Sequence, residues 1–431
     1  MAFRDSTSSD RTADKSLAFL KALFEGHDFG DFGMRLWDGT AWSWGSGRGD
    51  RFTLVFKHPS ALRRMFLFPN EVKLGEAYIY DDFDIEGDCE GVFDLGEHIL
   101  GSRRTLPESI RFGGFLLSLP RGGRNNEGRQ KAGLTGPRHS KKRDRQAISY
   151  HYDVSNDFFR LWLDEKMVYS CGYFASPDED LNTAQERKLD YICRKLRLMK
   201  GDRLLDIGCG WGGLLIHAAG NYGVTAEGIT LSRPQVEFAR ERIRDVGLSD
   251  RCRVELTDYR EIDEKEKFDK LVSVGMFEHV GQSKLSEYFR KAHRLLRPGG
   301  AFLNHGIARS EDQAKQRGPT FSDSYVFPDG ELLPINTTLR IAEENGFEVR
   351  DVESLREHYM MTLRHWVRRL EASRDEALKH VDEATYRVWR LFMSGSAHGF
   401  RVGRLNVYQT LLVKSDRDVS GLPLVRDDWY R

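Results

Sequence analysis

Residues 205–213 read Leu205-Asp206-Ile207-Gly208-Cys209-Gly210-Trp211-Gly212-Gly213, an apolar strand that runs into glycines and then into the start of a helix. Glycine lets the backbone turn sharply and approach a ligand closely, and the helix that follows presents free N–H groups. A nucleotide-like ligand is therefore expected over this turn, at the carboxyl edge of a parallel sheet.

The chain on both sides of the turn alternates strand-like and helical runs. Residues 203–207, 225–230 and 301–305 are apolar and strand-like, whereas residues 234–246 and 284–296 have a helical pattern. This alternation predicts an α/β fold, a Rossmann-like and mostly parallel sheet with helices on both faces.

The glycines alone do not identify the ligand. Gly208, Gly210 and Gly213 also fit the dinucleotide fingerprint. A dinucleotide site needs an acidic residue at the tip of the second strand, but residues 229–232 read Ile-Thr-Leu-Ser. Together with Asp206 just before the glycines, this favours S-adenosylmethionine over a nicotinamide cofactor.

The chain is long enough for two domains, with 431 residues. Residues 1–120 mix short strand-like and helical segments and predict a small α+β domain. Residues 121–146 are rich in Gly, Asn and basic side chains, with nine Lys or Arg and two acidic residues between 121 and 145. This composition predicts a basic flexible linker, and residues 147–431 would form the catalytic domain.

Global composition excludes several classes of protein. Lys+Arg and Asp+Glu are equal, at 66 each, so the net charge gives no indication of a nucleic-acid partner. The five cysteines have no spacing typical of a metal site, and we expect reduced thiols and no metal. The polar N-terminus and the lack of a long apolar run predict a cytoplasmic protein.

Four further segments carry a family resemblance. They are His151-Tyr152-Asp153 leading to Tyr169-Ser170-Cys171, then residues 230–235 (TLSRPQ), residues 275–281 (GMFEHVG), and Thr362-Leu363 with Trp366. With the glycine turn, they resemble the cyclopropane-fatty-acid and mycolic-acid cyclopropane synthases from about residue 147 to the C-terminus. Only the bacterial phospholipid enzymes carry a comparable N-terminal domain, so the chain resembles cyclopropane-fatty-acyl-phospholipid synthases most. The first domain would then be lipid-binding.

The resemblance implies transfer of a methylene group from S-adenosylmethionine to the cis double bond of an unsaturated phospholipid acyl chain, which closes a cyclopropane ring. Thr230 and Ser232 also fit helix capping before Pro234. The implied cofactor-binding residues are Tyr169, Ser170, Asp206, Gly208, Cys209, Gly210, Gly212, Gly213, Thr230, Ser232 and Gln235.

Ring closure requires a base, and the family uses a bound bicarbonate ion. Glu278 and His305 are expected to share a proton and hold this anion through hydrogen bonds. Ser396 stands where relatives often have Cys, and we expect that cysteine to be dispensable. The implied ligands are the Cys171 main chain, Glu278, His305, the Ile307 main chain and Tyr359.

Two alternatives remain open at the level of the sequence. A related enzyme would methylate the same kind of acyl chain but end with a methylene- or methyl-branched product. A protein of another class would bind or transfer lipid without catalysis. The resemblance to the bacterial enzymes also implies a homodimer. We expect the enzyme to attach peripherally to the inner face of an anionic membrane, with the basic linker helping it to dock.

Overall fold

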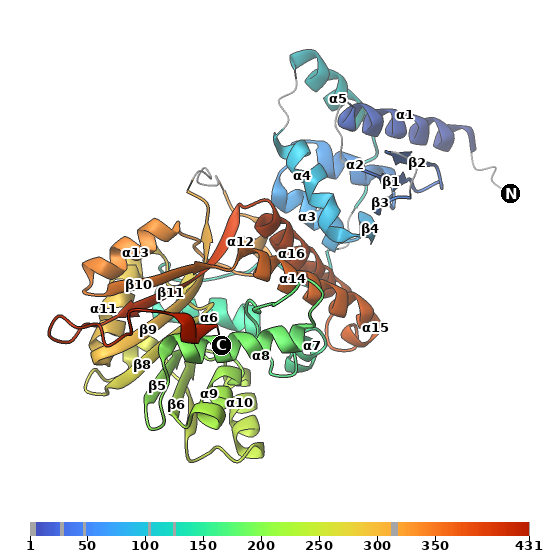
Figure 1. Ribbon diagram of the computed structural model, residues 1–431. Coiled ribbons are helices and arrows are strands. Elements are labelled where there is room, and N and C mark those ends of the chain that lie inside the picture. Colours follow the sequence, from blue (N-terminus) through green and yellow to red (C-terminus); the bar gives the residue numbers. More distant parts are fainter. Residues whose placement is uncertain are drawn as a thin grey trace. The chain divides into compact units, whose positions relative to one another are not determined.

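The computed structural model of the protein describes residues 6–25, 30–45, 49–101, 105–123, 126–311 and 318–430 (Figure 1). The chain forms two compact units. The first unit comprises Met1–Lys131, Gly318–Tyr325 and Asp382–His398. The second unit comprises Ala132–Arg317, Val326–Val381 and Gly399–Arg431.

The first unit is the small α+β fold that the sequence predicts. Its sheet has the strand order β2-β1-β3-β4, in which only β1 and β3 are parallel. Aromatic side chains form much of its core, and the Phe32 ring stacks on Phe52 at 5.5 Å. Its elements are α1 (Ser6–Phe24), β1 (Phe32–Arg35), β2 (Ala41–Trp44), β3 (Phe52–Phe56), α2 (Pro59–Phe66), α3 (Glu71–Ile79), β4 (Phe83–Gly87), η1 (Cys89–Gly91), α4 (Val92–Gly101), α5 (Leu106–Ser118), α12 (Phe321–Tyr325) and residues 383–398 of α16 (Glu383–Arg401).

The second unit is built on a seven-stranded sheet of order β10-β11-β9-β8-β5-β6-β7. Strands β5 to β9 pair in parallel, and β11 and β10 extend the sheet antiparallel. The strands are β5 (Arg203–Ile207), β6 (Thr225–Thr230), β7 (Cys252–Leu256), β8 (Phe268–Val274), β9 (Leu296–Arg309), β10 (Glu348–Ser354) and β11 (Leu405–Val413). The α-helices are α6 (Lys141–Tyr152), α7 (Asn156–Arg160), α8 (Leu181–Leu196), α9 (Gly213–Tyr222), α10 (Arg233–Asp245), α11 (Leu285–Leu295), α13 (Ile335–Glu344), α14 (Arg356–Ala372) and α15 (Arg374–Ala377).

Helices cover both faces of this sheet (Figure 1). Successive side chains of a strand point to opposite faces, and Leu204 and Leu205 accordingly belong to two different apolar clusters. The Leu204 cluster includes residues of α8, α9 and α10, whereas the Leu205 cluster includes residues of α11 and α13. The predicted methyltransferase-like, mostly parallel fold is confirmed.

The predicted boundary between the domains differs from the structure. Residues 141–146 are not a flexible linker, because they form the first half of α6. Ser140 caps this helix by accepting from the Arg143 amide at 3.4 Å, and the Arg143 side chain donates to Asp329 at 3.0 Å. The second unit therefore begins before residue 147, and it lacks residues 318–325 and 382–398.

None of the helices in the described ranges combines the length and apolar content that a membrane crossing requires.

Candidate functional site

The glycine turn joins β5 to α9 through backbone angles that favour glycine. Gly208, Gly210 and Gly212 have φ values of 89°, 54° and 80°. The amides of Gly208 and Cys209 both donate to the Ile229 carbonyl at 3.0 Å, which ties the turn to the end of β6. The turn is thus held against two strand ends.

Gly213, the first residue of α9, is required for a different reason. A Cβ at this position would lie 2.7 Å from the carbonyl oxygen of Lys166 and 3.2 Å from the Val168 side chain. Only glycine lets the helix start this close to the 166–168 segment.

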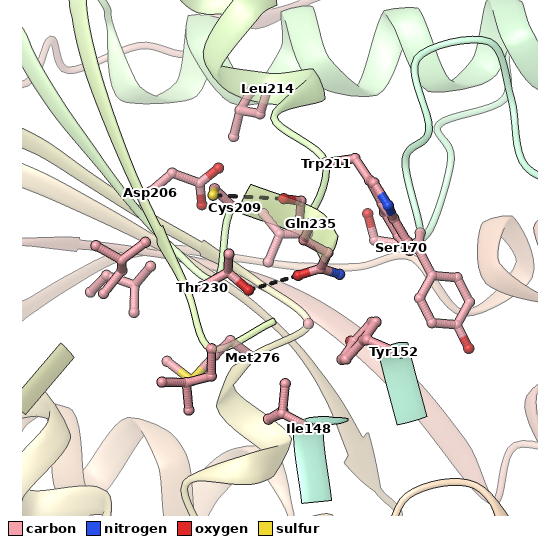
Figure 2. A pocket seen from close by; sticks show the side chains of 18 of the residues that line it. Ile148, Tyr152, Ser170, Asp206, Cys209, Trp211, Leu214, Thr230, Gln235 and Met276 are labelled. Atoms are coloured by element: carbon pink, nitrogen blue, oxygen red, sulfur yellow. Dashed lines mark hydrogen bonds between the residues drawn. The ribbon is translucent and has the colours of Figure 1, made fainter. Parts of the chain in front are cut away.

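A pocket lies over the turn at the carboxyl ends of β5, β6 and β8, where ligands of open α/β sheets bind (Figure 2). Nine of the eleven predicted cofactor-binding residues line it: Tyr169, Ser170, Asp206, Gly208, Cys209, Gly210, Gly213, Thr230 and Gln235. Their binding roles remain predictions.

The other two predicted residues, Gly212 and Ser232, do not line this pocket. Gly212 is the N-cap of α9. Ser232 is the N-cap of α10, where its hydroxyl accepts from the Gln235 amide at 3.4 Å and donates to Asp153 at 2.9 Å. The Thr230 hydroxyl donates to the Gln235 side-chain oxygen at 2.7 Å, which leaves the amide N–H groups of that glutamine side chain for another partner (Figure 2).

Asp206 is one of three aspartates that line the pocket. It is buried, and burial raises its pKa to about 7, although the positive charge of Lys188 acts in the opposite direction. Its Oδ1 atom has no hydrogen-bond partner among the described residues. A cationic group of a bound ligand would satisfy this oxygen and favour the charged carboxylate.

Two further groups of pocket residues were not predicted from the sequence. Lys188, on α8, lines the pocket beside Ser170, and residues 257–260 line another part of it. In the second group Arg260 donates to Asp144 at 2.8 Å and to Asp258 at 2.6 Å. The position of residues 257–260 directly after β7 was an available signal, since ligands gather at such strand ends.

A second cluster, formed by Glu278, His305, Ile307 and Gln409, joins β8, β9 and β11. Glu278 lies in η3 (Phe277–His279) after β8, and its Oε1 accepts from the Ile307 amide at 2.7 Å. His305 lies opposite Gln409 in the β9–β11 register, and Nδ1 of His305 lies 3.3 Å from Nε2 of Gln409. We call this group the Glu278–His305 cluster.

Three buried atoms of the cluster have no hydrogen-bond partner among the described residues: Oε2 of Glu278, Nε2 of His305 and Oε1 of Gln409. Burial raises the pKa of Glu278 to about 7. Burial, with the charges of Lys188 and Lys195, lowers the pKa of His305 to about 3. Burial thus favours the neutral form of both side chains.

In the described residues Glu278 is bonded to the Ile307 amide, and His305 lies against Gln409, which the strand register places opposite it. The proton shared between Glu278 and His305, and the part expected of the Ile307 main chain, remain predictions.

Cys171 and Tyr359, the remaining predicted members, meet at the carbonyl of Leu355. The Cys171 thiol donates to it at 3.8 Å, and the Tyr359 amide donates to it at 3.0 Å. Burial raises the pKa of both side chains, so both stay protonated. The Trp366 ring lies 6.0 Å from the Tyr359 ring and 5.1 Å from that of Tyr169, and thus connects the pocket to Tyr359.

Ser396 lies on α16 within the first unit and is partly exposed. All five cysteines are free and buried. In the described part of the chain, no group of three His, Cys, Asp or Glu side chains is placed to hold a metal ion.

The sheet order and the glycine turn agree with the comparisons below, which show that the second unit is an S-adenosylmethionine-dependent methyltransferase domain. A family model described as mycolic acid cyclopropane synthetase matches residues 139–410. The chain belongs to this family. A model described as a domain of unknown function matches residues 19–97, in the first unit.

Two similar proteins match along almost the whole chain. A "probable fatty acid methyltransferase" of Pseudomonas putida is 40% identical over 92% of this chain and 96% of its own length. The "probable fatty acid methyltransferase Rv3720" of Mycobacterium tuberculosis is 38% identical over 86% of this chain and 89% of its own.

Two similar solved structures each cover about three fifths of the chain. The cyclopropane synthase MmaA2 of Mycobacterium tuberculosis is 33% identical with a TM-score of 0.59, over 62% of this chain and 97% of its own. Mycolic acid cyclopropane synthase CmaA1, in complex with SAH and CTAB, is 35% identical with the same TM-score and coverage.

Proposed function

We propose that the protein transfers the methyl group of S-adenosylmethionine to the double bond of an unsaturated fatty acyl chain and gives a methylene- or methyl-branched product. The observation that carries this proposal is similarity over 406 residues to a probable fatty acid methyltransferase, which includes the first unit. The cyclopropane mycolic acid synthases match only about three fifths of the chain, for example 61% for synthase 1 of Mycobacterium tuberculosis.

Cyclopropane formation, the outcome expected from the sequence, is the second candidate. The family model and the solved relatives bear the names of cyclopropane synthases, and this observation supports it. A non-enzymatic lipid carrier is not supported, since the chain belongs to a methyltransferase family.

Both products share the first chemical step. The methyl carbon leaves the sulfonium sulfur and bonds to one alkene carbon, which leaves a positive charge on the other. Loss of a proton from the transferred methyl group then closes a ring. If a hydride shifts first between the two former alkene carbons, loss of the same proton gives a methylene branch instead. A saturated methyl branch would further require a hydride donor.

The residues of the Glu278–His305 cluster fit bicarbonate as the base. Their three unpaired buried atoms suit a small group that both donates and accepts hydrogen bonds. When bound, bicarbonate would take up the proton that the cation loses. The protonated Glu278 carboxyl and the neutral His305 imidazole would hold it by donating hydrogen bonds, and Gln409 would fix the imidazole.

Aromatic rings beside the pocket suit a cationic reaction. Tyr169 lines the pocket and lies against Trp366, with ring centroids 5.1 Å apart. Ring faces attract positive charge without forming a bond to it, so they would stabilise the sulfonium and the acyl cation without trapping either.

The acyl acceptor in this proposal is a phospholipid. Its double bond lies inside a bilayer, so the enzyme would bind reversibly to an anionic membrane surface and withdraw the chain. The homodimer expected from the family resemblance belongs to the same proposal, as does lipid binding by the first unit.

Lipids of a bacterial host expressing the protein test the proposal. We expect mass spectrometry to show acyl chains that gain one CH₂ unit, and proton NMR to show alkene protons of a methylene group. Ring-methylene protons would instead establish the second candidate. An unchanged lipid profile, with the protein present and able to bind S-adenosylmethionine, would contradict both.

A further inference from the structure

Lys188 is a buried lysine on α8 that the mechanism above does not use. It is 1% exposed and lines the cofactor pocket. Burying an ammonium group is costly unless hydrogen bonds and opposite charges compensate for the lost water. The question is therefore what compensates Lys188.

The protein itself satisfies this ammonium only in part. Its Nζ donates to the Ser170 hydroxyl at 2.9 Å, which is its one recorded hydrogen bond in the described ranges. A lysine ammonium has three protons to donate. No carboxylate of the described residues lies within ion-pair distance of it.

The neighbouring carboxylates are engaged elsewhere or incompletely charged. Asp164 accepts from the amides of Lys166 at 2.9 Å and Val168 at 2.8 Å. Asp206 interacts with Lys188 only through space, and burial raises the pKa of this aspartate to about 7. Arg260, the other strongly basic residue of the pocket lining, is paired with Asp144 and Asp258.

The Ser170 hydroxyl links the Lys188 ammonium group to the pocket by a hydrogen bond. Its hydroxyl oxygen accepts from Lys188, so its own proton is free to point at a ligand. Gln185, one turn earlier on α8, donates to the Ser170 carbonyl at 2.7 Å and fixes the residue from the other side. Lys188 and Ser170 together present a positively polarised donor at a buried position.

We infer that Lys188 is a positioning residue which, through Ser170, makes the pocket select a methyl donor whose amino-acid end carries a carboxylate. S-adenosylmethionine has such a carboxylate, and its decarboxylated analogue does not. This inference rests on S-adenosylmethionine binding and not on the identity of the acyl acceptor.

Calorimetry on the full-length protein with three ligands tests the inference. We expect the wild type to bind S-adenosylmethionine roughly ten- to a hundredfold more tightly than decarboxylated S-adenosylmethionine, the range of a hydrogen bond to a charged group. Lys188→Met should reduce this ratio to within a few-fold. Methylthioadenosine, which lacks the amino-acid end, should bind both proteins equally.

Lys195→Met is the matched control. Lys195 lies two turns further along α8, is equally buried, and pairs with Glu353 and Asp351 away from the pocket lining. This variant should lose stability and keep the wild-type ratio. If Lys188→Met does not fold, Ser170→Ala removes the same relay and should lower the ratio.

An unchanged ratio in Lys188→Met or in a folded Ser170→Ala would overturn the inference. A weaker affinity for all three ligands alike would also overturn it, since that pattern indicates a merely structural lysine. A protein that binds S-adenosylmethionine with the expected ratio but modifies no fatty acyl chain would contradict the proposed function and leave this inference intact.

Discussion

The cofactor pocket and the Glu278–His305 cluster each contain one buried carboxyl group whose pKa burial raises to about 7, Asp206 and Glu278 respectively. They differ in what surrounds that group. Asp206 lies in the field of the Lys188 ammonium, whereas Glu278 receives only the Ile307 amide and its own backbone. This difference supports the proposals that the pocket binds a ligand carrying both charges and that the cluster holds a small group able to donate and accept hydrogen bonds.

The largest expected effect is a loss of turnover, without a loss of cofactor affinity, when the Glu278–His305 cluster is changed. Glu278→Leu removes the carboxyl group and leaves the Ile307 amide without its acceptor. We expect turnover to fall roughly a hundred- to a thousandfold, as for other lost catalytic hydrogen bonds. Affinity for S-adenosylmethionine, measured by calorimetry, should stay within a few-fold of the wild type.

Glu331→Leu is the control for this variant, because Glu331 also accepts a backbone amide, that of Gln282, at 2.7 Å. It should retain most of the turnover. Normal turnover in Glu278→Leu would exclude the cluster from the chemistry.

A substitution at the start of α9 is expected to lower the affinity of the pocket for its ligand. Gly213→Ala places a methyl group 2.7 Å from the Lys166 carbonyl, and the 166–168 segment, which helps to line the pocket, must move. Overpacking of this kind costs about 1–3 kcal/mol, so we expect affinity for S-adenosylhomocysteine to fall by roughly five- to a hundredfold. Gly220→Ala, on the same helix with its nearest neighbour 3.9 Å away, should bind normally. Equal affinities would show that the close contact is dispensable.

The two raised carboxyl pKa values predict a dependence of stability on pH. Because the pKa of each group is higher in the folded protein than in the unfolded chain, the folded protein binds more protons between the two values. The contribution of each group to the free energy of unfolding is therefore fully present at low pH and is lost as the pH rises from about 4 to about 7. Glu278→Gln and Asp206→Asn should each flatten the fall in melting temperature over this range. Saturating S-adenosylhomocysteine should reduce the difference in pH dependence between Asp206→Asn and the wild type. It should have less effect on the corresponding difference between Glu278→Gln and the wild type. Parallel curves for all three proteins would contradict this prediction.

Binding to an anionic membrane is expected to depend on exposed basic side chains, whereas cofactor binding is not. Several basic residues of the 121–146 stretch are engaged internally; for example, Lys141 donates to Glu261 at 3.1 Å. Lys142 and Arg145 are exposed on α6. Lys142→Gln with Arg145→Gln should weaken binding to anionic vesicles at low salt by about thirtyfold, at about 1 kcal/mol for each of the two charges, without a change in cofactor affinity.

Lys200→Gln with Lys265→Gln makes the same change of charge at other exposed positions and is the control. The difference between the two double variants should fade at high salt, where the Debye length falls to about 3 Å. Equal vesicle binding at low salt would show that this part of α6 does not contact the membrane.

The smallest effect is expected at Ser396. If the cluster needs no thiol, Ser396→Ala should keep most of the activity, and Ser396→Cys should not raise it. A large loss in the alanine variant, measured as turnover at saturating substrate, would show that this hydroxyl has a chemical role.

The sequence alone was sufficient for the parts that are continuous along the chain. The predicted strand at residues 203–207 coincides with β5, and that at 225–230 coincides with β6. A contiguous motif fixes the glycine turn, because neighbouring residues determine its backbone angles and the helix that follows.

The tertiary structure alone decided the parts that depend on distant neighbours. Gln409 became a partner of His305 through the pairing of β11 with β9, and Lys188 became a pocket residue through the packing of α8 against the sheet. Residues 141–146 are polar and basic and did not indicate a helix. The contact between Arg143 and Asp329, which stabilises this part of α6, joins residues 186 positions apart in the chain, so the local sequence does not reveal it. Local sequence thus determined the strands and the turn, whereas hydrogen bonds and burial between remote segments determined which polar groups meet in the site.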